Sequence, residues 1–161
     1  MKLISLFCVT FVMLFSEPAA AQQIEKWKIN RLEQYIRQGD KPVIINFWAT
    51  FCKPCVEEIP YFQGMIKKYE KEGIELLLVS LDLQEAYPKI KEFAAKHSFS
   101  SSIVYLNETN ADLFCPKVDE KWSGAIPATL FVNNRTGYRK FFEEQIPEQK
   151  LEAEIKALIK K

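Results

Sequence analysis

The 161-residue sequence has almost no net charge, a single histidine, and no internal repeat or low-complexity tract. Its 22 lysines and arginines nearly balance its 21 acidic residues, so the formal net charge is +1. This balance argues against the basic surface by which proteins hold nucleic acid, and no nucleic-acid partner is expected. The single histidine, His97, also gives little support to catalysis by a cysteine–histidine pair.

Cysteine is scarce as well. The chain has four, and Cys8 lies in an N-terminal stretch typical of a cleavable signal peptide. Lys2 gives that stretch its positive start, residues 3–15 form its apolar core, and residues 19–21 offer an Ala-Ala-Ala cleavage site. The apolar run is too short for a membrane span, and too few residues precede Cys8 for a lipoprotein signal. We therefore expect residues 1–21 to be removed and residues 22–161 to form one exported domain.

Three cysteines would then remain, so a monomer can form at most one internal disulfide, which argues against a disulfide-stapled scaffold. Cys52-Lys53-Pro54-Cys55 follow an apolar run at residues 43–48 and precede a helix-like run at 56–62. A helix start favours the thiolate at Cys52, and Cys55, one turn inside, would resolve a mixed disulfide on Cys52. The pattern predicts a redox-active dithiol at a strand-to-helix junction.

Two other uses of this cysteine pair remain open. Half of a zinc site would need two further ligands, for which only Cys115 and His97 are available. A permanent structural disulfide would add little stability, because the closed loop is so short. We expect no metal site. Cys115 itself is interpreted as a buried, inert thiol, with a third redox thiol as the alternative.

Alternating apolar runs and amphipathic segments predict an α/β fold. Strands are predicted at residues 43–48, 74–81, 102–106, 128–133 and 138–143, the last two joined by a hairpin turn containing Gly137. Helices are predicted at residues 28–37, 52–72, 88–97, 110–122 and 149–160, with a kink at Pro60 and a break at Pro116. This order implies a mixed sheet with helices on both faces.

Residues 47–55, Phe-Trp-Ala-Thr-Phe-Cys-Lys-Pro-Cys, resemble the active-site segment of thioredoxins, most closely that of the TlpA/ResA-like thiol-disulfide oxidoreductases. Residues 124–132, Gly-Ala-Ile-Pro-Ala-Thr-Leu-Phe-Val, match a second motif of the superfamily. The resemblance covers residues 27–161. It implies a thioredoxin fold, with a mixed central β-sheet flanked by helices on both faces and a TlpA-like helix-strand insertion at residues 88–106.

The resemblance also implies a function. Such proteins act as reductants in the periplasm on cysteines of exported proteins, including cytochrome c precursors, and a membrane thiol donor recharges them. The dithiol would need no cofactor, and the protein is expected to be a monomer. Two rival classes are a peroxiredoxin-like peroxidase, whose proline-threonine-cysteine motif is absent, and a non-enzymatic thiol-binding chaperone, against which the intact dithiol argues.

One departure from thioredoxins concerns a buried acid. Thioredoxins carry an aspartate where this sequence has Asn46. TlpA-like members often lack that aspartate and carry a glutamate three residues after the second cysteine, a position that Glu58 occupies here. Glu58 would share a helical face with Cys55 and could exchange protons with it. The alternative is a solvated acid in the first turn, favoured by the helix dipole.

The remaining site residues are assigned to tuning and to substrate contact. Lys53 is expected to lower the pKa of Cys52, with a solvated side chain of small effect as the alternative, and Pro54 removes a backbone donor nearby. By resemblance, the Ile126–Pro127 bond is cis and the loop faces the dithiol, so that Ile126 can offer backbone hydrogen bonds to an extended substrate. The predicted substrate-binding residues are Trp48, which also packs in the core, Phe51, Ala125, Ile126 and Pro127.

Overall fold

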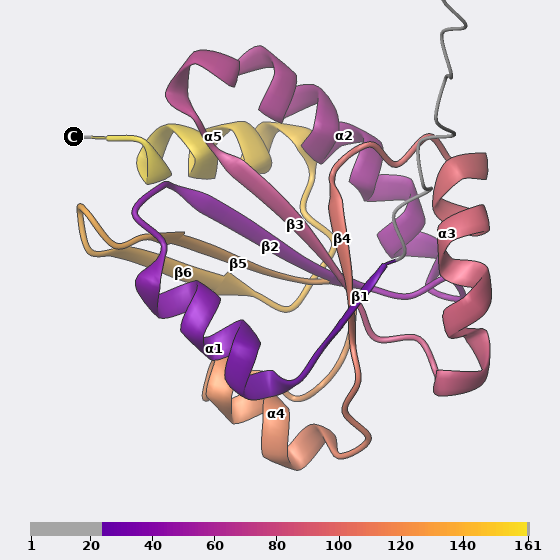
Figure 1. Cartoon of the computed structure of the whole chain (residues 1–161). Coiled ribbons are helices and arrows are strands. Elements are labelled where there is room, and N and C mark those ends of the chain that lie inside the picture. The colour runs from indigo at the N-terminus through magenta and orange to yellow at the C-terminus, as the bar shows by residue number, and fades with distance from the viewer. Residues whose placement is uncertain (1–23, 161) are drawn as a thin grey trace, which may run out of the picture.

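The computed structural model of the protein describes residues 24–160 (Figure 1). The predicted signal peptide, its cleavage site and Cys8 lie outside these residues. Among residues 24–160, no helix combines the length and the apolar character that crossing a membrane requires.

One six-stranded sheet runs through the described chain, in the order β1-β4-β3-β2-β5-β6. Its strands are β1 (Glu25–Trp27), β2 (Val43–Trp48), β3 (Glu75–Ser80), β4 (Ser102–Leu106), β5 (Ala128–Asn133) and β6 (Tyr138–Phe142). The first four strands in that order pair in parallel, whereas β5 pairs antiparallel with both β2 and β6. The predicted mixed sheet and its closing hairpin are confirmed.

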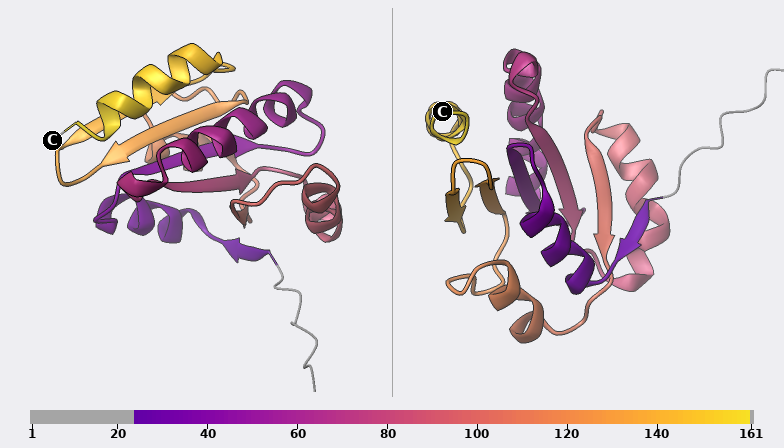
Figure 2. Two further views of the ribbon diagram at one scale, coloured as in Figure 1. Left: turned by 90° about the horizontal axis from the view of Figure 1, so that it is seen from above. Right: turned by 60° about the vertical axis from the view of Figure 1, so that its left-hand side comes forward.

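Five helices cover both faces of this sheet: α1 (Ile29–Gln38), α2 (Lys53–Lys68), α3 (Tyr87–Lys96), α4 (Ala111–Val118) and α5 (Glu148–Leu158). In Figure 1, α2 and α5 lie above the sheet while α1 and α4 lie below it. Figure 2 shows α5 running alongside the β5–β6 hairpin. The α3–β4 unit forms the predicted insertion and places β4 between β3 and β1.

Strand β2 shows how this sequence builds two cores. Successive side chains of a strand point to opposite faces of the sheet. Ile44 and Trp48 join the apolar cluster beneath α2, α3 and α5, whereas Val43, Ile45 and Phe47 join the cluster beneath α1 and α4. All six residues of β2 are buried, as a central strand covered on both faces requires. The dithiol therefore follows a strand that is held on both sides.

Three predictions about individual elements were wrong. Strand β1 was missed because three residues are too few to show a periodic pattern. The long helix ends at Lys68 rather than residue 72 and is followed by a 3₁₀ turn, η1 (Glu70–Glu72). Pro116 does not break α4, which continues to Val118. The missing N–H of Pro116 frees only the carbonyl of exposed Asp112, where water can bind.

Candidate active site

The two cysteines of the motif lie where β2 ends and α2 begins. Cys52 is the N-cap of α2, and Cys55 lies in its first turn. Their sulfurs are joined in a disulfide, with the Cα atoms 5.3 Å apart. Cys52 is 7% exposed, whereas Cys55 has no exposed surface. A reacting sulfur that approaches from solvent can therefore reach only Cys52.

The start of α2 sets the electrostatics around Cys52. Unpaired backbone N–H groups at a helix start carry partial positive charge, which favours a thiolate there. Pro54 lies in the first turn, where a missing N–H costs no helical hydrogen bond, and its carbonyl accepts from Gln145 at 3.2 Å. Lys53 is exposed, and its Nζ lies 3.7 Å from the carboxylate of Glu57. This partly balanced surface charge favours the small-effect interpretation of Lys53.

Glu58 lies one turn after Cys55 and is completely buried. Its Oε1 accepts a hydrogen bond from Asn46 Nδ2 at 2.8 Å, and its Oε2 accepts one from the backbone N–H of Ile146 at 2.9 Å. Burial raises the pKa of Glu58 to about 7, although these two hydrogen bonds oppose the rise. The alternative of a solvated first-turn acid is wrong, because no part of the residue reaches solvent.

Asn46 supplies the neutral partner of this acid from β2. Its Nδ2 also donates to Thr129 Oγ1 at 3.0 Å, while its Oδ1 has no hydrogen-bond partner within the described chain. A protonated Glu58 becomes a donor, and an Asn46 amide turned by half a rotation could accept that proton at Oδ1. Asn46 can therefore serve both protonation states of Glu58, which an ionised aspartate could not do.

The loop before β5 adjoins the end of β2, the strand that leads to the dithiol. The register pairs Phe47 of β2 with Ala128 of β5, so the residues just before Ala128 adjoin the end of β2. The Ile126–Pro127 peptide bond is cis, as predicted. Ala125 is exposed and Ile126 is half-buried. The backbone before Pro127 is thus available at the surface, next to the strand that leads to Cys52.

The two predicted aromatic residues of the site differ in exposure. Phe51, directly before Cys52, is 70% exposed. Trp48 has no exposed surface and packs beneath α3, with its ring centroid 5.3 Å from that of Phe99 and 6.1 Å from that of Phe93. The described structure therefore assigns core packing to Trp48 and leaves surface contact to Phe51.

Asp82 is a site residue that sequence reasoning missed. It follows β3, is 4% exposed, and accepts hydrogen bonds from Thr50 N–H at 3.0 Å, from Thr50 Oγ1 and from Ser80 Oγ at 2.8 Å. Thr50 lies two residues before Cys52, so this carboxylate fixes the loop that leads to Cys52. The only signal in the sequence was an acid directly after the strand predicted at residues 74–81.

Cys115 takes no part in the dithiol. It lies on the buried side of α4, 2% exposed, and burial raises the pKa of its thiol to about 11, with Glu143 and Asp112 adding to the rise. A thiol with so high a pKa is almost wholly protonated at neutral pH and reacts slowly. This agrees with the interpretation of Cys115 as an inert buried thiol.

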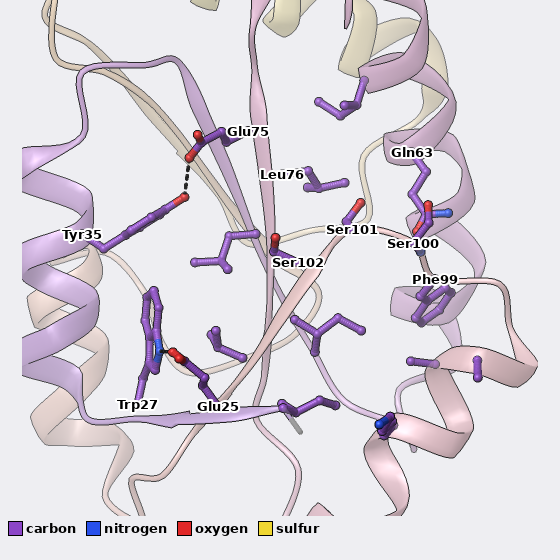
Figure 3. Close-up of a pocket in the computed structure, with 18 of the residues that line it drawn as sticks. Glu25, Trp27, Tyr35, Gln63, Glu75, Leu76, Phe99, Ser100, Ser101 and Ser102 are labelled. Atoms are coloured by element: carbon purple, nitrogen blue, oxygen red, sulfur yellow. Dashed lines mark hydrogen bonds between the residues drawn. The ribbon is translucent and has the colours of Figure 1, made fainter. Parts of the chain in front are cut away.

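A groove lined by residues of α1, α2, β3 and β4 lies away from the dithiol. Figure 3 shows it between Tyr35 of α1, Gln63 of α2 and the start of β4 at Ser102, with Glu75 opening β3. The parallel register aligns Glu75 with the beginning of β2, whereas the dithiol follows the end of β2. Neither Cys52 nor Cys55 lines this groove. Within residues 24–160, no cluster of three or more histidine, cysteine or acidic residues could hold a metal.

Comparison with known proteins places this site in a family. A model of the AhpC/TSA family matches residues 15–137. The thiol-disulfide oxidoreductase ResA of Geobacillus kaustophilus is 26% identical over 129 residues, which cover 80% of this chain and 68% of that protein. ResA of Oceanobacillus iheyensis is 50% identical over 42 residues, only 26% of this chain and 22% of that protein.

Solved structures show the same fold. A thioredoxin-related protein from Neisseria meningitidis serogroup B matches with a TM-score of 0.63 at 24% identity, over 74% of this chain and 86% of that one. A thiol:disulfide interchange protein of the thioredoxin family from Chlorobium tepidum matches with a TM-score of 0.61 at 18% identity, over 75% and 81%. The predicted thioredoxin fold is confirmed, and the ResA relatives and the Cys52–Cys55 pair support the predicted class of thiol-disulfide oxidoreductase. The chain therefore belongs to the AhpC/TSA family.

Proposed function

We propose that this protein is exported to the periplasm and reduces disulfides of other exported proteins through Cys52 and Cys55. The observation that carries the proposal is the unequal exposure of the pair: Cys52 can be reached from solvent and Cys55 cannot. The predicted signal peptide at residues 1–21 supports export. A membrane thiol donor would return the oxidised dithiol to its reduced form.

In the proposed reaction, the thiolate of reduced Cys52 attacks one sulfur of a substrate disulfide. A bond forms between Cys52 and that sulfur, and the other substrate sulfur leaves as a thiolate that takes up a proton. The thiol of Cys55 then loses its proton and attacks Cys52, which releases the second substrate sulfur. Two electrons have passed to the substrate, and the Cys52–Cys55 disulfide seen here is the oxidised product.

We propose that Glu58 accepts the proton that Cys55 loses when it attacks the mixed disulfide. Both residues are buried on the same side of α2, one turn apart. A carboxyl group whose pKa is about 7 is well matched to accept a proton near neutral pH and to release it again. Buried Asn46 can follow the change by turning its amide, so the acid stays hydrogen-bonded in both states.

The surface around Cys52 supports a protein as substrate. Phe51 and Leu83 are each 70% exposed, and Leu83 directly follows the Asp82 that holds the dithiol loop. Ala125 and Ile126 offer backbone at the edge of the same surface. We propose that an extended segment carrying the target cysteine lies between Phe51 and the Ile126–Pro127 loop.

Variants of the mature protein with one active-site cysteine replaced test the proposal in an insulin-reduction assay with a small thiol as the reductant. Cys52→Ser should abolish reduction, whereas Cys55→Ser should accumulate mixed disulfides visible on non-reducing gels. Trapped species with Cys52→Ser instead would reverse the two roles. Undiminished client binding by both variants would favour a chaperone, and consumption of hydrogen peroxide that outpaces insulin reduction would favour a peroxidase. The reduction potential of the pair decides whether the protein acts as a reductant or an oxidant.

A further inference from the structure

Glu143 is hydrogen-bonded to the loop that precedes Pro127. It directly follows β6 and is half-buried. Its Oε1 accepts hydrogen bonds from Ser123 N–H at 3.0 Å and Ala125 N–H at 2.8 Å, and it also contacts Ser123 Oγ. No lysine or arginine of the described chain pairs with it. Instead of pairing with a cation, this carboxylate accepts hydrogen bonds from N–H groups of one short loop.

The charge of this carboxylate is retained in the folded protein. Partial burial raises the pKa of Glu143, but the hydrogen bonds from Ser123 and from the backbone of Ser123, Ala125 and Gly124 outweigh it and lower the pKa. Hydrogen bonds to an ionised acceptor are roughly twice as strong as those between neutral groups. Glu143 thus makes charge-assisted hydrogen bonds to a loop that has no helical or strand pairing of its own.

The same loop is held from beneath by α4. Gly124 has φ of 98°, a left-handed conformation that favours glycine. A Cβ atom at Gly124 would lie 3.6 Å from Ala111 Cβ and 3.7 Å from Cys115 Sγ, so the loop backbone rests directly on the helix. Trp122 Nε1 donates to the Ala125 carbonyl at 2.9 Å. The loop is therefore fixed on its inner side by packing and on its outer side by Glu143.

We propose that Glu143 is a positioning residue for protein substrates: it holds residues 123–125 so that the backbone of Ile126 meets an extended, cysteine-containing segment bound at Cys52. This inference rests on the proposed thiol-disulfide exchange. A polypeptide that lies along residues 125–126 needs that backbone held in one conformation before binding, because ordering it afterwards costs affinity. A small disulfide can react at Cys52 without touching the loop.

The difference between these two kinds of substrate provides the test. In a mature Cys55→Ser protein, the second-order rate constant of Cys52 is measured with an extended cysteine peptide whose sulfur is blocked by thionitrobenzoate. It is measured again with the small disulfide 5,5′-dithiobis(2-nitrobenzoate). Both reactions release the same coloured thiolate, so the ratio of the two constants isolates the contribution of the loop. The added variants are Glu143→Ala and Glu143→Gln, with Glu144→Ala as the matched control.

Glu143→Ala should lower the peptide-to-small-molecule ratio about tenfold, the scale of losing charge-assisted hydrogen bonds. Glu143→Gln keeps an acceptor oxygen but loses the charge, so its ratio should fall between those of Glu143→Ala and the parent. Glu144 is exposed and pairs with Lys150 rather than with the loop, so its removal should leave the ratio unchanged.

Three results would overturn the inference. These are an unchanged ratio in Glu143→Ala, an equal loss of both rate constants in that variant, and a parent protein that shows no preference for the peptide. Amide hydrogen exchange distinguishes a loosened loop from a misfolded variant. A folded Glu143→Ala protein should exchange faster at residues 123–126 and at the parent's rate elsewhere. Failure of the proposed function would look different, since Cys52 of the parent would then react with neither disulfide.

Discussion

The raised pKa of Glu58 predicts that the oxidised protein loses stability as the pH rises through neutrality. Unfolding returns the carboxyl to water, where its pKa is 4.5, against about 7 in the folded protein. A group whose folded pKa is raised favours folding fully below its unfolded pKa, and that advantage is lost as the pH rises through the folded value. At about 1.4 kcal/mol per pKa unit, the loss between about pH 4.5 and pH 8 approaches 3 kcal/mol.

Glu58→Gln should remove this dependence. The substituted amide has the shape of the acid and cannot ionise. It keeps one acceptor for the N–H of Ile146, and Asn46 can turn its amide so that Oδ1, which has no partner in the described chain, accepts from the new NH₂ group. At about pH 5 the variant should lie within about 1 kcal/mol of the parent. At about pH 8 it should be the more stable protein by about 2–3 kcal/mol.

Urea unfolding of the two oxidised proteins between about pH 5 and pH 8 measures the difference. A Cys115→Ala background prevents exchange of the free thiol with the disulfide in unfolded chains. Glu57→Gln is the matched control, because Glu57 is the neighbouring exposed acid and should give parallel curves. If the pH dependence of Glu58→Gln runs parallel to that of the parent, the reasoning is refuted, since Glu58 would then not titrate in this range.

In the reduced protein, Glu58→Gln should slow resolution of the mixed disulfide more than the first attack by Cys52.

Two further predictions concern Cys115 and Asp82. Cys115→Ala should retain insulin-reducing activity near that of the parent and lose little stability, because only a small buried group is removed; a loss of turnover as large as that of Cys52→Ser would make Cys115 part of the relay. Asp82→Ala should lower the free energy of unfolding by about 1–3 kcal/mol, because Thr50 and Ser80 lose a charged acceptor. Urea unfolding measures it, and an unchanged midpoint would contradict the role given to Asp82.

The parts of the site that the sequence could predict are those set by neighbouring residues. The apolar run at residues 43–48, the helix start at Cys52 and the burial of Cys55 one turn later all follow from local patterns. The prediction of a cis bond before Pro127 rested on the resemblance to thioredoxins. Local preference could not predict it, since most such bonds are trans. Local patterns could place the dithiol, and the motif could place the loop beside it.

The parts that could not be predicted depend on segments far apart in the chain. The local pattern leaves Glu58 open to two interpretations, an acid that serves Cys55 and a solvated acid. Its burial involves a hydrogen bond from the backbone N–H of Ile146, 88 residues later. Asp82 reaches Thr50 across the ends of two strands that are 32 residues apart. Glu143 follows β6 and meets Ser123, which precedes β5, at the open end of the β5–β6 hairpin. Each of these carboxylates finds its partner only once the sheet has formed, so no periodic signal could reveal it.

The structure gives a physical reason why position 46 is asparagine here, where thioredoxins carry an aspartate. Asn46 Nδ2 lies 2.8 Å from Glu58 Oε1, so an acid at position 46 would place two carboxyl groups side by side in a buried space. Like charges at that distance cannot both ionise, and the first to do so would keep the other neutral. With asparagine there, a single acid titrates, and it is carried by the same helix as Cys55. The separation of the acid from the resolving cysteine is then fixed by one turn of α2 rather than by packing of the helix on the sheet.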